Sequence, residues 1–420
     1  MKKIFFLLCS LFLISGLFAQ TEISGSLTGY VYTLIDNMPG RETDDYSAPS
    51  AAVLEQWRAM LDTFLTDDDL AATAAMADGM GYELVHLTDG TEEYYILRTK
   101  ASSSNYWGTY VLNRSASLCR KVVIQSPHPK YDLNTGREGI YVMRHAVPYF
   151  FCMAGTHRCN STYYSPCDGT TTACSSSSQS YRISDMAHNT NTIFEVTTEF
   201  LARHDPALVF IQLHGFAMRD TDPYVIMSNG TRLTPSPDWL DSLKEALHDA
   251  DPVLDFRVAH QDPDWNRLIA FTNVQGRYLN GSTDICKADA DTVSGRFIHV
   301  EQEKTRLRAD SAKWEKMVYA VSHAFPLVPL AVEEPAASLQ VMVSPNPFSD
   351  RTVITWQDHA GNYDLSLYAV TGREVRHLKG LTGGRVLLQR DGLPPGLYFF
   401  ILSDRKAKRF AGRVVVEGGD

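Results

Sequence analysis

Two histidines and an aspartate follow apolar runs of this chain at positions where strands are expected to end. His128 and Asp132 lie in the stretch S-P-H-P-K-Y-D, directly after the apolar residues 122–124. His214 comes directly after a second run, L-V-F-I-Q-L at 208–213. Open α/β sheets place their ligand sites beyond the carboxyl ends of strands. We therefore expect the three side chains to meet at one edge of a sheet.

These side chains are the donors that a hydrolytic zinc ion uses. Zn²⁺ binds histidine nitrogen and carboxylate oxygen, and a catalytic site keeps three protein ligands and one open position for water. His188, in the stretch S-D-M-A-H, is a candidate ligand in place of Asp132. The alternative for each histidine is a packed or surface role, which is the commoner one for a single histidine. The pattern predicts a zinc site.

A carboxylate that ends a later apolar run is the candidate general base. In F-I-H-V-E, residues 297–301, Glu301 is expected to take a proton from water and pass it to a leaving amine. Glu303 competes for this role because a shift of two residues keeps it on the same side of a strand. Glu301 is preferred because it lies closer to the apolar run, where burial raises a carboxyl pKa. Either residue could instead be a surface carboxylate.

Five polar residues are candidates for substrate binding or for positioning the ligands. Arg158 follows an expected strand and suits a substrate carboxylate or an oxyanion, with a plain ion pair as the alternative. Asp185 and His188 could orient a ligand histidine by contacting the side of its ring that does not bind the metal. Asp185 could instead favour a helix N-terminus. Asn273 and Arg277 lie in a polar loop that could bind substrate, with turn chemistry as the alternative.

The elements that must position these residues alternate between strands and helices. Helical spacing predicts helices, and period-two or continuous apolar runs predict strands. The expected helices cover 50–75, 70–80, 137–146, 184–203, 237–248 and 304–324, and the expected strands cover 83–87, 94–98, 107–112, 122–124, 147–153, 208–213, 257–260, 268–271 and 297–300. This order predicts an α/β domain over residues 21–325, a mixed sheet flanked by helices.

The remainder of the chain has a different composition. Residues 326–338 are rich in proline and read as a semi-rigid linker. Residues 339–420 contain six short alternating segments separated by glycine- and proline-rich turns. Such spacing predicts a small all-β sandwich of the immunoglobulin-like type.

The whole-chain properties indicate an exported globular protein. The 420 residues are 44% hydrophobic, and the net charge of −10 gives no reason to expect a nucleic-acid partner. Residues 1–20 have a basic start and a short apolar run, as in a secretory signal peptide. No later segment reaches the about 18–20 apolar residues of a membrane span, so no stable transmembrane segment is expected.

The cysteines suit the same compartment. Six cysteines remain beyond the signal, an even number that favours disulfides or buried thiols in an exported protein. Cys167 and Cys174 flank a threonine-rich loop and are candidates to pair.

The order of the candidate residues resembles that of the zinc carboxypeptidase-like hydrolases. His-x-x-x-Asp, an arginine, His-Gly and a strand-borne glutamate occur in this order over about residues 105–322. The order is particularly similar to the poly-gamma-glutamate hydrolase branch. The resemblance implies a carboxypeptidase-like fold, zinc held by His128, Asp132 and His214, and Glu301 as the base. The chain departs from the family in having Asp132 where the amidase branch tends to have glutamate.

The resemblance implies a secreted zinc hydrolase of amide or peptide bonds. A metal-dependent esterase or deacetylase is the alternative enzyme. A non-catalytic secreted surface-binding protein, in which these polar residues are structural, is the alternative from another class.

Three motifs of the tail resemble the C-terminal sorting domain of type IX secretion substrates. They are S-P-N-P-F at 344–348, L-Y-A-V-T-G-R-E-V at 367–375 and L-P-P-G-L-Y at 393–398. This resemblance implies that the type IX secretion machinery is a partner. It also implies passage across an outer membrane, followed by release or surface attachment.

Overall fold

The chain divides into two compact units near residue 327. The computed structural model describes residues 20–114, 118–329, 341–356, 362–369, 373–404 and 409–418. Residues 1–19 of the expected signal peptide and 330–338 of the expected linker lie outside the described residues. The detailed boundaries 21–325 and 339–420 stay predictions, and each unit is described by itself.

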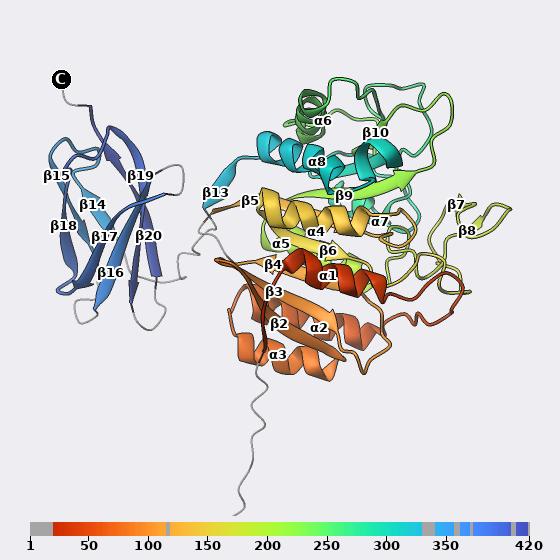
Figure 1. Cartoon of the computed structure of the whole chain (residues 1–420), viewed down its shortest axis with the longest axis horizontal. Coiled ribbons are helices and arrows are strands. Elements are labelled where there is room, and N and C mark those ends of the chain that lie inside the picture. The colour runs from red at the N-terminus through yellow and green to blue at the C-terminus, as the bar shows by residue number, and fades with distance from the viewer. Residues whose placement is uncertain are drawn as a thin grey trace, which may run out of the picture. The chain divides into compact units, whose positions relative to one another are not determined.

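The first unit combines one large sheet with eight α-helices over its described residues (Figure 1). The helices are α1 (Leu27–Asp36), α2 (Ala51–Leu65), α3 (Leu70–Gly79), α4 (Thr135–Ala146), α5 (Ile193–His204), α6 (Trp239–Ala250), α7 (Val274–Leu279) and α8 (Ser311–Ala324), with a π-helical turn η1 (Lys304–Arg308) before α8. The strands are β1 (Thr21–Ser24), β2 (Tyr82–Asp89), β3 (Glu92–Thr99), β4 (Thr109–Asn113), β5 (Leu118–Ser126), β6 (Pro148–Met153), β9 (Val209–Phe216), β10 (Val225–Ser228), β11 (Phe256–Val258) and β12 (Phe297–Glu303). Two-residue strands β7 (Thr170–Thr171) and β8 (Gln179–Ser180) form a separate hairpin, and β13 (Leu327–Pro329) lies at the division between the units.

The sheet is mixed, as the sequence predicts, and its centre is parallel. The strand order is β1-β2-β3-β4-β6-β5-β9-β12-β10-β11. Strands β6, β5, β9 and β12 are parallel neighbours, whereas β2, β3 and β4 pair antiparallel, as do β4 with β6 and β10 with β12. The carboxyl ends of the four central strands therefore lie at one edge of the sheet.

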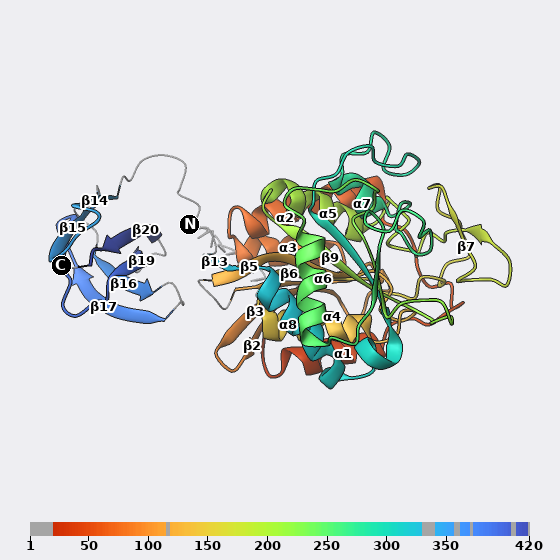
Figure 2. The ribbon, with the colours of Figure 1, turned by 90° about the horizontal axis from the view of Figure 1, so that it is seen from above.

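Helices cover both faces of the sheet, and each face has its own apolar core. One core joins α1, α4, α6 and α8 to the strands, and the other joins α2, α3, α5 and α7. Figure 2 shows α2, α5 and α7 on one side of the central strands and α1, α4 and α8 on the other. Alternate residues of a strand point to opposite faces. The side chains of Gln125, Gln212 and His214 consequently face the α5 and α7 side, whereas their neighbours Ile124, Ile211 and Leu213 enter the other core.

Most expected elements are confirmed, and the differences have local causes. Helix α2 begins where the sequence predicts, and it is capped by Ser50, whose hydroxyl accepts from the main-chain N–H of Val53. The helix expected from residue 184 begins only at Ile193, because Thr192 is its cap. Ser184, at the expected start of this helix, caps no helix, and its hydroxyl donates to the carbonyl of Arg158. The helix expected from 304 starts at Ser311, after η1 and the cap Asp310.

Two expectations about the loops are wrong. Residues 268–271 form no strand, because Leu268 and Ala270 both have positive φ angles that extended backbone does not allow. Cys167 does not pair with Cys174. The disulfides are Cys159–Cys174 and Cys167–Cys286, and Cys119 and Cys152 are buried thiols. Partners separated by 119 residues cannot be chosen from local spacing.

The second unit is built from two antiparallel sheets, as the tail predicts. Its described strands are β14 (Met342–Ser344), β15 (Arg351–Thr355), β16 (Tyr363–Ala369), β17 (Glu374–Leu381), β18 (Arg385–Gln389), β19 (Gly396–Asp404) and β20 (Arg409–Val416). The sheets have the orders β14-β15-β18 and β17-β16-β19-β20. Trp356, Tyr363 and Phe400 contribute to the core between them.

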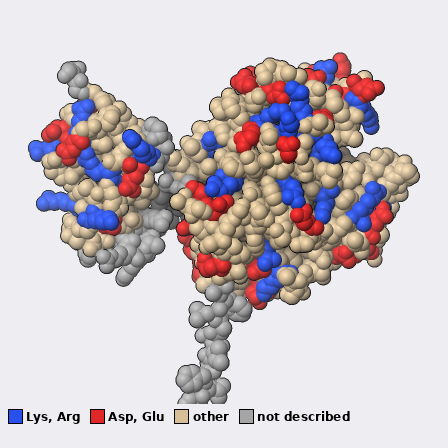
Figure 3. Space-filling view, in the orientation of Figure 1, with Lys and Arg blue, Asp and Glu red and all other residues tan. Residues whose placement is uncertain are grey.

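The charged groups of the first unit are mixed on its surface. Figure 3 shows lysine and arginine interspersed with aspartate and glutamate over the visible face. Among the described residues, every helix is too short or too polar to cross a membrane.

A buried carboxyl group on α4 couples the stability of the first unit to pH. Glu138 is fully buried, and its Oε2 accepts from Gln302 Nε2 at 2.9 Å. Burial raises the pKa of Glu138 from 4.5 to about 8, although Gln302 and Arg308 oppose the shift. The folded protein therefore keeps a proton that the unfolded chain releases above pH 4.5, so stability falls as pH rises from about 4.5 to about 8.

We expect Glu138→Gln to reduce this loss of stability. The amide oxygen can still accept from Gln302, and no proton has to be retained in the folded state. A pKa that differs by one between the folded and unfolded states corresponds to about 1.4 kcal/mol, so guanidinium unfolding at pH 5 and pH 8 should separate the variant from the wild type. Glu245→Gln, an exposed change on α6, is the control and should behave as the wild type. Equal pH losses in wild type and Glu138→Gln would contradict this account.

Candidate metal centre

The structure brings the three expected ligands together at the carboxyl edge of the sheet. His128 and Asp132 lie in the loop between β5 and α4, and His214 lies near the end of β9. Their exposed fractions are 1%, 4% and 3%. Because β5 and β9 are parallel neighbours, residues that are 86 positions apart reach one point. Metal binding itself stays a prediction.

Both imidazole rings present the same nitrogen to the same carboxylate oxygen. His128 Nδ1 and His214 Nδ1 each lie 3.2 Å from Asp132 Oδ2. The three ligand atoms are all within 4.8 Å of one another. Bonds of 2.0–2.2 Å around a tetrahedral zinc ion put ligand atoms about 3.3 Å apart. The donor set and its spacing therefore fit a Zn²⁺ ion with three protein ligands.

The far nitrogen of His128 is held by Asp185. His128 Nε2 lies 2.9 Å from Asp185 Oδ1, and Asp185 Oδ2 accepts from Nε and Nη2 of Arg158. A carboxylate only accepts, so Nε2 carries the hydrogen and Nδ1 is turned to Asp132. Asp185 contacts this ring from a loop and not from a helix start, and its role in orienting a metal ligand stays a prediction.

His188 lies behind Asp185. Its Nδ1 is 3.0 Å from Asp185 Oδ1, and its ring stacks on Tyr181 at 3.6 Å between centroids. His128, Asp185 and His188 form a second group that could hold a metal ion. However, the oxygens of Asp185 already accept from His128, Arg158 and the main chain of Ala187. The geometry favours His188 as a support of Asp185 over its use as a ligand in place of Asp132.

The far nitrogen of His214 is held by a buried amide. His214 Nε2 lies 2.8 Å from Gln212 Oε1. As in His128, the ring is fixed through Nε2 and its Nδ1 faces Asp132. Metal-ligating histidines commonly have their second nitrogen bound in this way.

The electrostatics of the site call for a cation between these groups. Burial opposes ionisation of Asp132, but its interactions with the His128 and His214 rings outweigh burial and lower the pKa of Asp132 far below its usual range. Burial and Arg158 oppose charge on His128, yet Asp185 and Asp132 raise the pKa of its ring. Burial lowers the pKa of His214 to about 4. A carboxylate between two ring nitrogens needs a proton or a metal ion as its partner.

Glu301 lies beside this group with unused hydrogen-bonding capacity. In the register of β9 and β12, Glu301 is opposite His214. Burial and the charge of Asp132 raise the pKa of Glu301 to about 8. Among the described residues, Glu301 Oε2 and His299 Nδ1 are buried without a hydrogen-bond partner. Buried polar atoms of this kind usually meet water, an ion or a substrate.

Glu303 has a structural task instead. Its two oxygens accept from the main-chain N–H groups of Thr305 and Arg306 at 2.7 Å, and they cap η1. These bonds leave Glu301 as the better placed of the two candidate bases.

Arg158 points one end of its guanidinium group at the site. Nε and Nη2 are bound to Asp185, while Nη1 lies 3.4 Å from His128 Nδ1. Tyr131 lies near the guanidinium, with 5.3 Å between Arg158 Cζ and the ring centroid. The ion pair that was the alternative role of Arg158 is therefore present, with Asp185 as the partner. It also turns Nη1 of Arg158 toward His128.

A buried arginine holds the ligand loop in place. Arg308 donates to the carbonyls of Gln302 and Leu133, and Asn134 Nδ2 donates back to the carbonyls of Arg308 and Ala309 at 2.8 and 3.0 Å. Gly215 makes room for this arginine, because a Cβ there would overlap the guanidinium group of Arg308.

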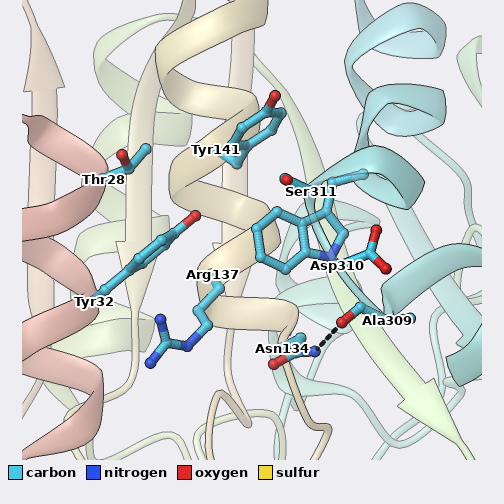
Figure 4. A pocket seen from close by; sticks show the side chains of 9 residues that line it. Thr28, Tyr32, Asn134, Arg137, Tyr141, Ala309, Asp310 and Ser311 are labelled. Atoms are coloured by element: carbon cyan, nitrogen blue, oxygen red, sulfur yellow. Dashed lines mark hydrogen bonds between the residues drawn. The ribbon is translucent and has the colours of Figure 1, made fainter.

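Figure 4 shows the hydrogen bond from Asn134 to Ala309, which lies at one end of a pocket of about 450 Å³. Tyr32 and Trp314 also line this pocket.

The two expected substrate-binding residues have other partners. Asn273 is buried and caps α7, and its side chain also donates to Gln212. Arg277 pairs with Asp168 and Asp289 and donates to the carbonyls of Phe271 and Cys286. These contacts give both residues structural roles, and their contact with substrate stays a prediction.

Sequence reasoning missed two residues of the site. Gln212 and His299 each lie two positions before a residue that it selected, His214 and Glu301. A separation of two along a strand puts side chains on the same face. The sequence contained a signal for both residues. Each is a polar residue inside an otherwise apolar strand, two positions before a candidate.

The comparisons with known proteins are weak. No family model and no curated protein matches the chain. A Burkholderia mallei protein, provisionally named a carboxypeptidase, is 12% identical over 60% of this chain and 66% of its own, with a TM-score of 0.32. A Bacteroides vulgatus protein with an immunoglobulin-like β-sandwich fold is 9% identical over 19% of this chain and 95% of its own, with a TM-score of 0.16. CopC of Methylosinus trichosporium is 16% identical over 20% and 97%, also with a TM-score of 0.16. Function is therefore inferred from the geometry of the site alone.

We expect the purified protein to bind about one zinc ion per chain, as three converging ligands imply. His128→Ala and His214→Ala should each lose it, as measured by metal analysis after dialysis. His260→Ala is a matched control, because the ring of His260 is also buried but pairs with Asp238 and not with these ligands. Unchanged zinc content in both ligand variants would exclude the site.

Proposed function

We propose that this protein is an exported zinc-dependent hydrolase of amide or peptide bonds. The observation that carries the proposal is the convergence of His128 Nδ1 and His214 Nδ1 on Asp132 Oδ2, at 3.2 Å each. Both rings are held through Nε2, so the ligand set exists before an ion binds. Three protein ligands leave a position open for water, which is typical of catalytic and not of structural zinc sites.

A zinc ion in such a site lowers the pKa of water and polarises a carbonyl oxygen. Glu301 is the residue that we assign to proton transfer. It lies on the strand next to His214, it is buried, and its Oε2 has no partner among the described residues. A free carboxylate oxygen in this position can take a proton from the attacking water and deliver it to the leaving group.

Arg158 is the group that we assign to the substrate's oxygen atoms. Asp185 fixes the guanidinium through Nε and Nη2, which leaves Nη1 toward the site. A fixed cationic donor stabilises negative charge that develops on a carbonyl oxygen, and it also suits a substrate carboxylate.

The proton path favours an amide over an ester substrate. An amine leaves only after it receives a proton, whereas an alcohol needs less assistance. Glu301, a buried carboxyl group whose Oε2 has no hydrogen-bond partner among the described residues, supplies that proton. Esterase or deacetylase activity is the alternative, and a panel of matched amide and ester substrates separates these activities.

Export is supported by the two disulfides. Cys159–Cys174 and Cys167–Cys286 both lie in the loops near the site. Structural disulfides are typical of proteins outside the cytoplasm. Export by the type IX machinery, through a signal peptide at 1–20 and a sorting domain at 339–420, is proposed from the sequence motifs.

Glu301→Gln should retain zinc and lose turnover. The amide has nearly the same shape but cannot accept and return a proton, and general acid–base groups contribute about 10²–10⁴-fold to rates. The measurement is the rate of peptide or amide hydrolysis by the full chain, together with its zinc content.

Glu303→Gln is the matched control. It loses one of two bonds that cap η1, so it should be less stable but keep its turnover. Full activity of zinc-loaded Glu301→Gln would remove Glu301 from the mechanism. Zinc-bound wild type that cleaves neither amides nor esters would favour the non-catalytic binding protein.

A further inference from the structure

A chain of buried side-chain amides lies behind His214. Gln125, Gln212, Asn273 and Gln275 all have exposed fractions of 0–1%. They come from β5, β9 and α7 with its cap, and they are joined to one another by hydrogen bonds. Amide oxygen and nitrogen atoms have opposite hydrogen-bonding roles, so the orientation of one group constrains the next.

The direction of this chain is set by the main chain of α7. Asn273 is the cap of this helix, and its Oδ1 accepts from the main-chain N–H of Gly276 at 2.9 Å. A main-chain N–H can only donate, so this side of Asn273 has to be its oxygen. The Nδ2 group of Asn273 therefore faces Gln212 Oε1, at 2.5 Å.

The orientation of the Gln212 amide determines which nitrogen of His214 carries the hydrogen. Its Oε1 accepts from Asn273 and lies 2.8 Å from His214 Nε2. An oxygen that faces a ring nitrogen at this distance requires a hydrogen on that nitrogen. His214 thus carries its hydrogen on Nε2, which leaves Nδ1 free for a ligand.

The other end of Gln212 prevents the amide from turning over. Its Nε2 donates to Gln125 Oε1 and Gln275 Oε1, each at 3.1 Å. Gln275 is itself oriented, because its Nε2 donates to the carbonyl of Met186 at 2.8 Å. All four hydrogen-bonding positions of the Gln212 amide are used. A flipped amide would place oxygen against oxygen on this side and leave Asn273 without an acceptor.

We infer that Asn273 and Gln212 are positioning residues that set the tautomer of His214, with its hydrogen on Nε2 and its ligand atom at Nδ1. The relay runs from the main-chain N–H of Gly276 through Asn273 and Gln212 to the ring. Its consequence for zinc rests on the proposed function, whereas the tautomer does not. The relay gives Asn273 a role in holding the proposed metal ligand His214, which is different from the substrate contact that the sequence suggested.

Asn273→Asp is the variant that reverses the relay with little change of shape. One carboxylate oxygen can still accept from Gly276, so the helix cap is retained. The other oxygen replaces the donor that faces Gln212 Oε1, and two acceptors then oppose each other. Loss of a supporting partner of this kind typically weakens metal affinity by about 10–100-fold.

Asn280→Asp is a closely matched control. Asn280 is buried at the other end of α7, its Oδ1 accepts from the main-chain N–H of Ser294, and its Nδ2 donates to the carbonyl of Asn229. The same substitution therefore removes the same type of donor, but outside the relay. Zinc affinity of the full chain, measured by competition with a chelating dye, should fall in Asn273→Asp and not in Asn280→Asp. Equal affinities in these two variants would overturn the inference.

The tautomer of His214 can also be measured directly in the wild type, which tests the inference even if Asn273→Asp does not fold. Nitrogen-15 NMR of the histidine rings, with His214→Ala used to assign the signal, should show a hydrogen on His214 Nε2 with and without zinc. A bare Nε2 in the wild type would refute the relay. If zinc fails to bind while Nε2 carries its hydrogen, the proposed function fails and the relay stands.

Discussion

The central constraint of this protein is the approach of two imidazole nitrogens to one carboxylate oxygen. His128 Nδ1 and His214 Nδ1 both lie 3.2 Å from Asp132 Oδ2, in surroundings from which water is largely excluded. Such a group is stable only with a cation among its atoms, either a proton or a metal ion. Each ring is held through Nε2, by the Asp185 carboxylate in one case and by the Gln212 amide in the other.

The sheet makes this approach possible. β5, β9 and β12 are parallel neighbours, so their carboxyl ends deliver the ligand loop, His214 and Glu301 to one edge. The loop that carries Asp132 is fixed by hydrogen bonds. Arg308 donates to the carbonyl of Leu133, and Asn134 donates to the carbonyls of Arg308 and Ala309. A site assembled on rigid strands and a tied loop needs little reorganisation during a reaction.

The polar groups around the site differ in how completely they are satisfied. Gln212, Asp185 and Arg308 use their hydrogen-bonding capacity on the protein itself, and they support the ligands. Glu301 Oε2 and His299 Nδ1 have no partner among the described residues, although both are buried. This contrast distinguishes Glu301 and His299 from the residues that hold the candidate ligands in place.

The sequence by itself determined the strands that precede or carry His128, His214 and Glu301, most of the helices between them, and the all-β tail, because hydrophobic periodicity and caps are local. It also pointed to His128, Asp132 and His214, since a strand end is visible in the chain. Tertiary structure alone decided that Cys167 pairs with Cys286 and that hydrogen bonds link Asn273 to His214 through Gln212. It also decided that Glu303 caps η1, whereas Oε2 of Glu301 has no hydrogen-bond partner among the described residues. These outcomes depend on which neighbours residues far apart in the chain acquire, and hydrogen-bond partners across a sheet are not encoded in local spacing.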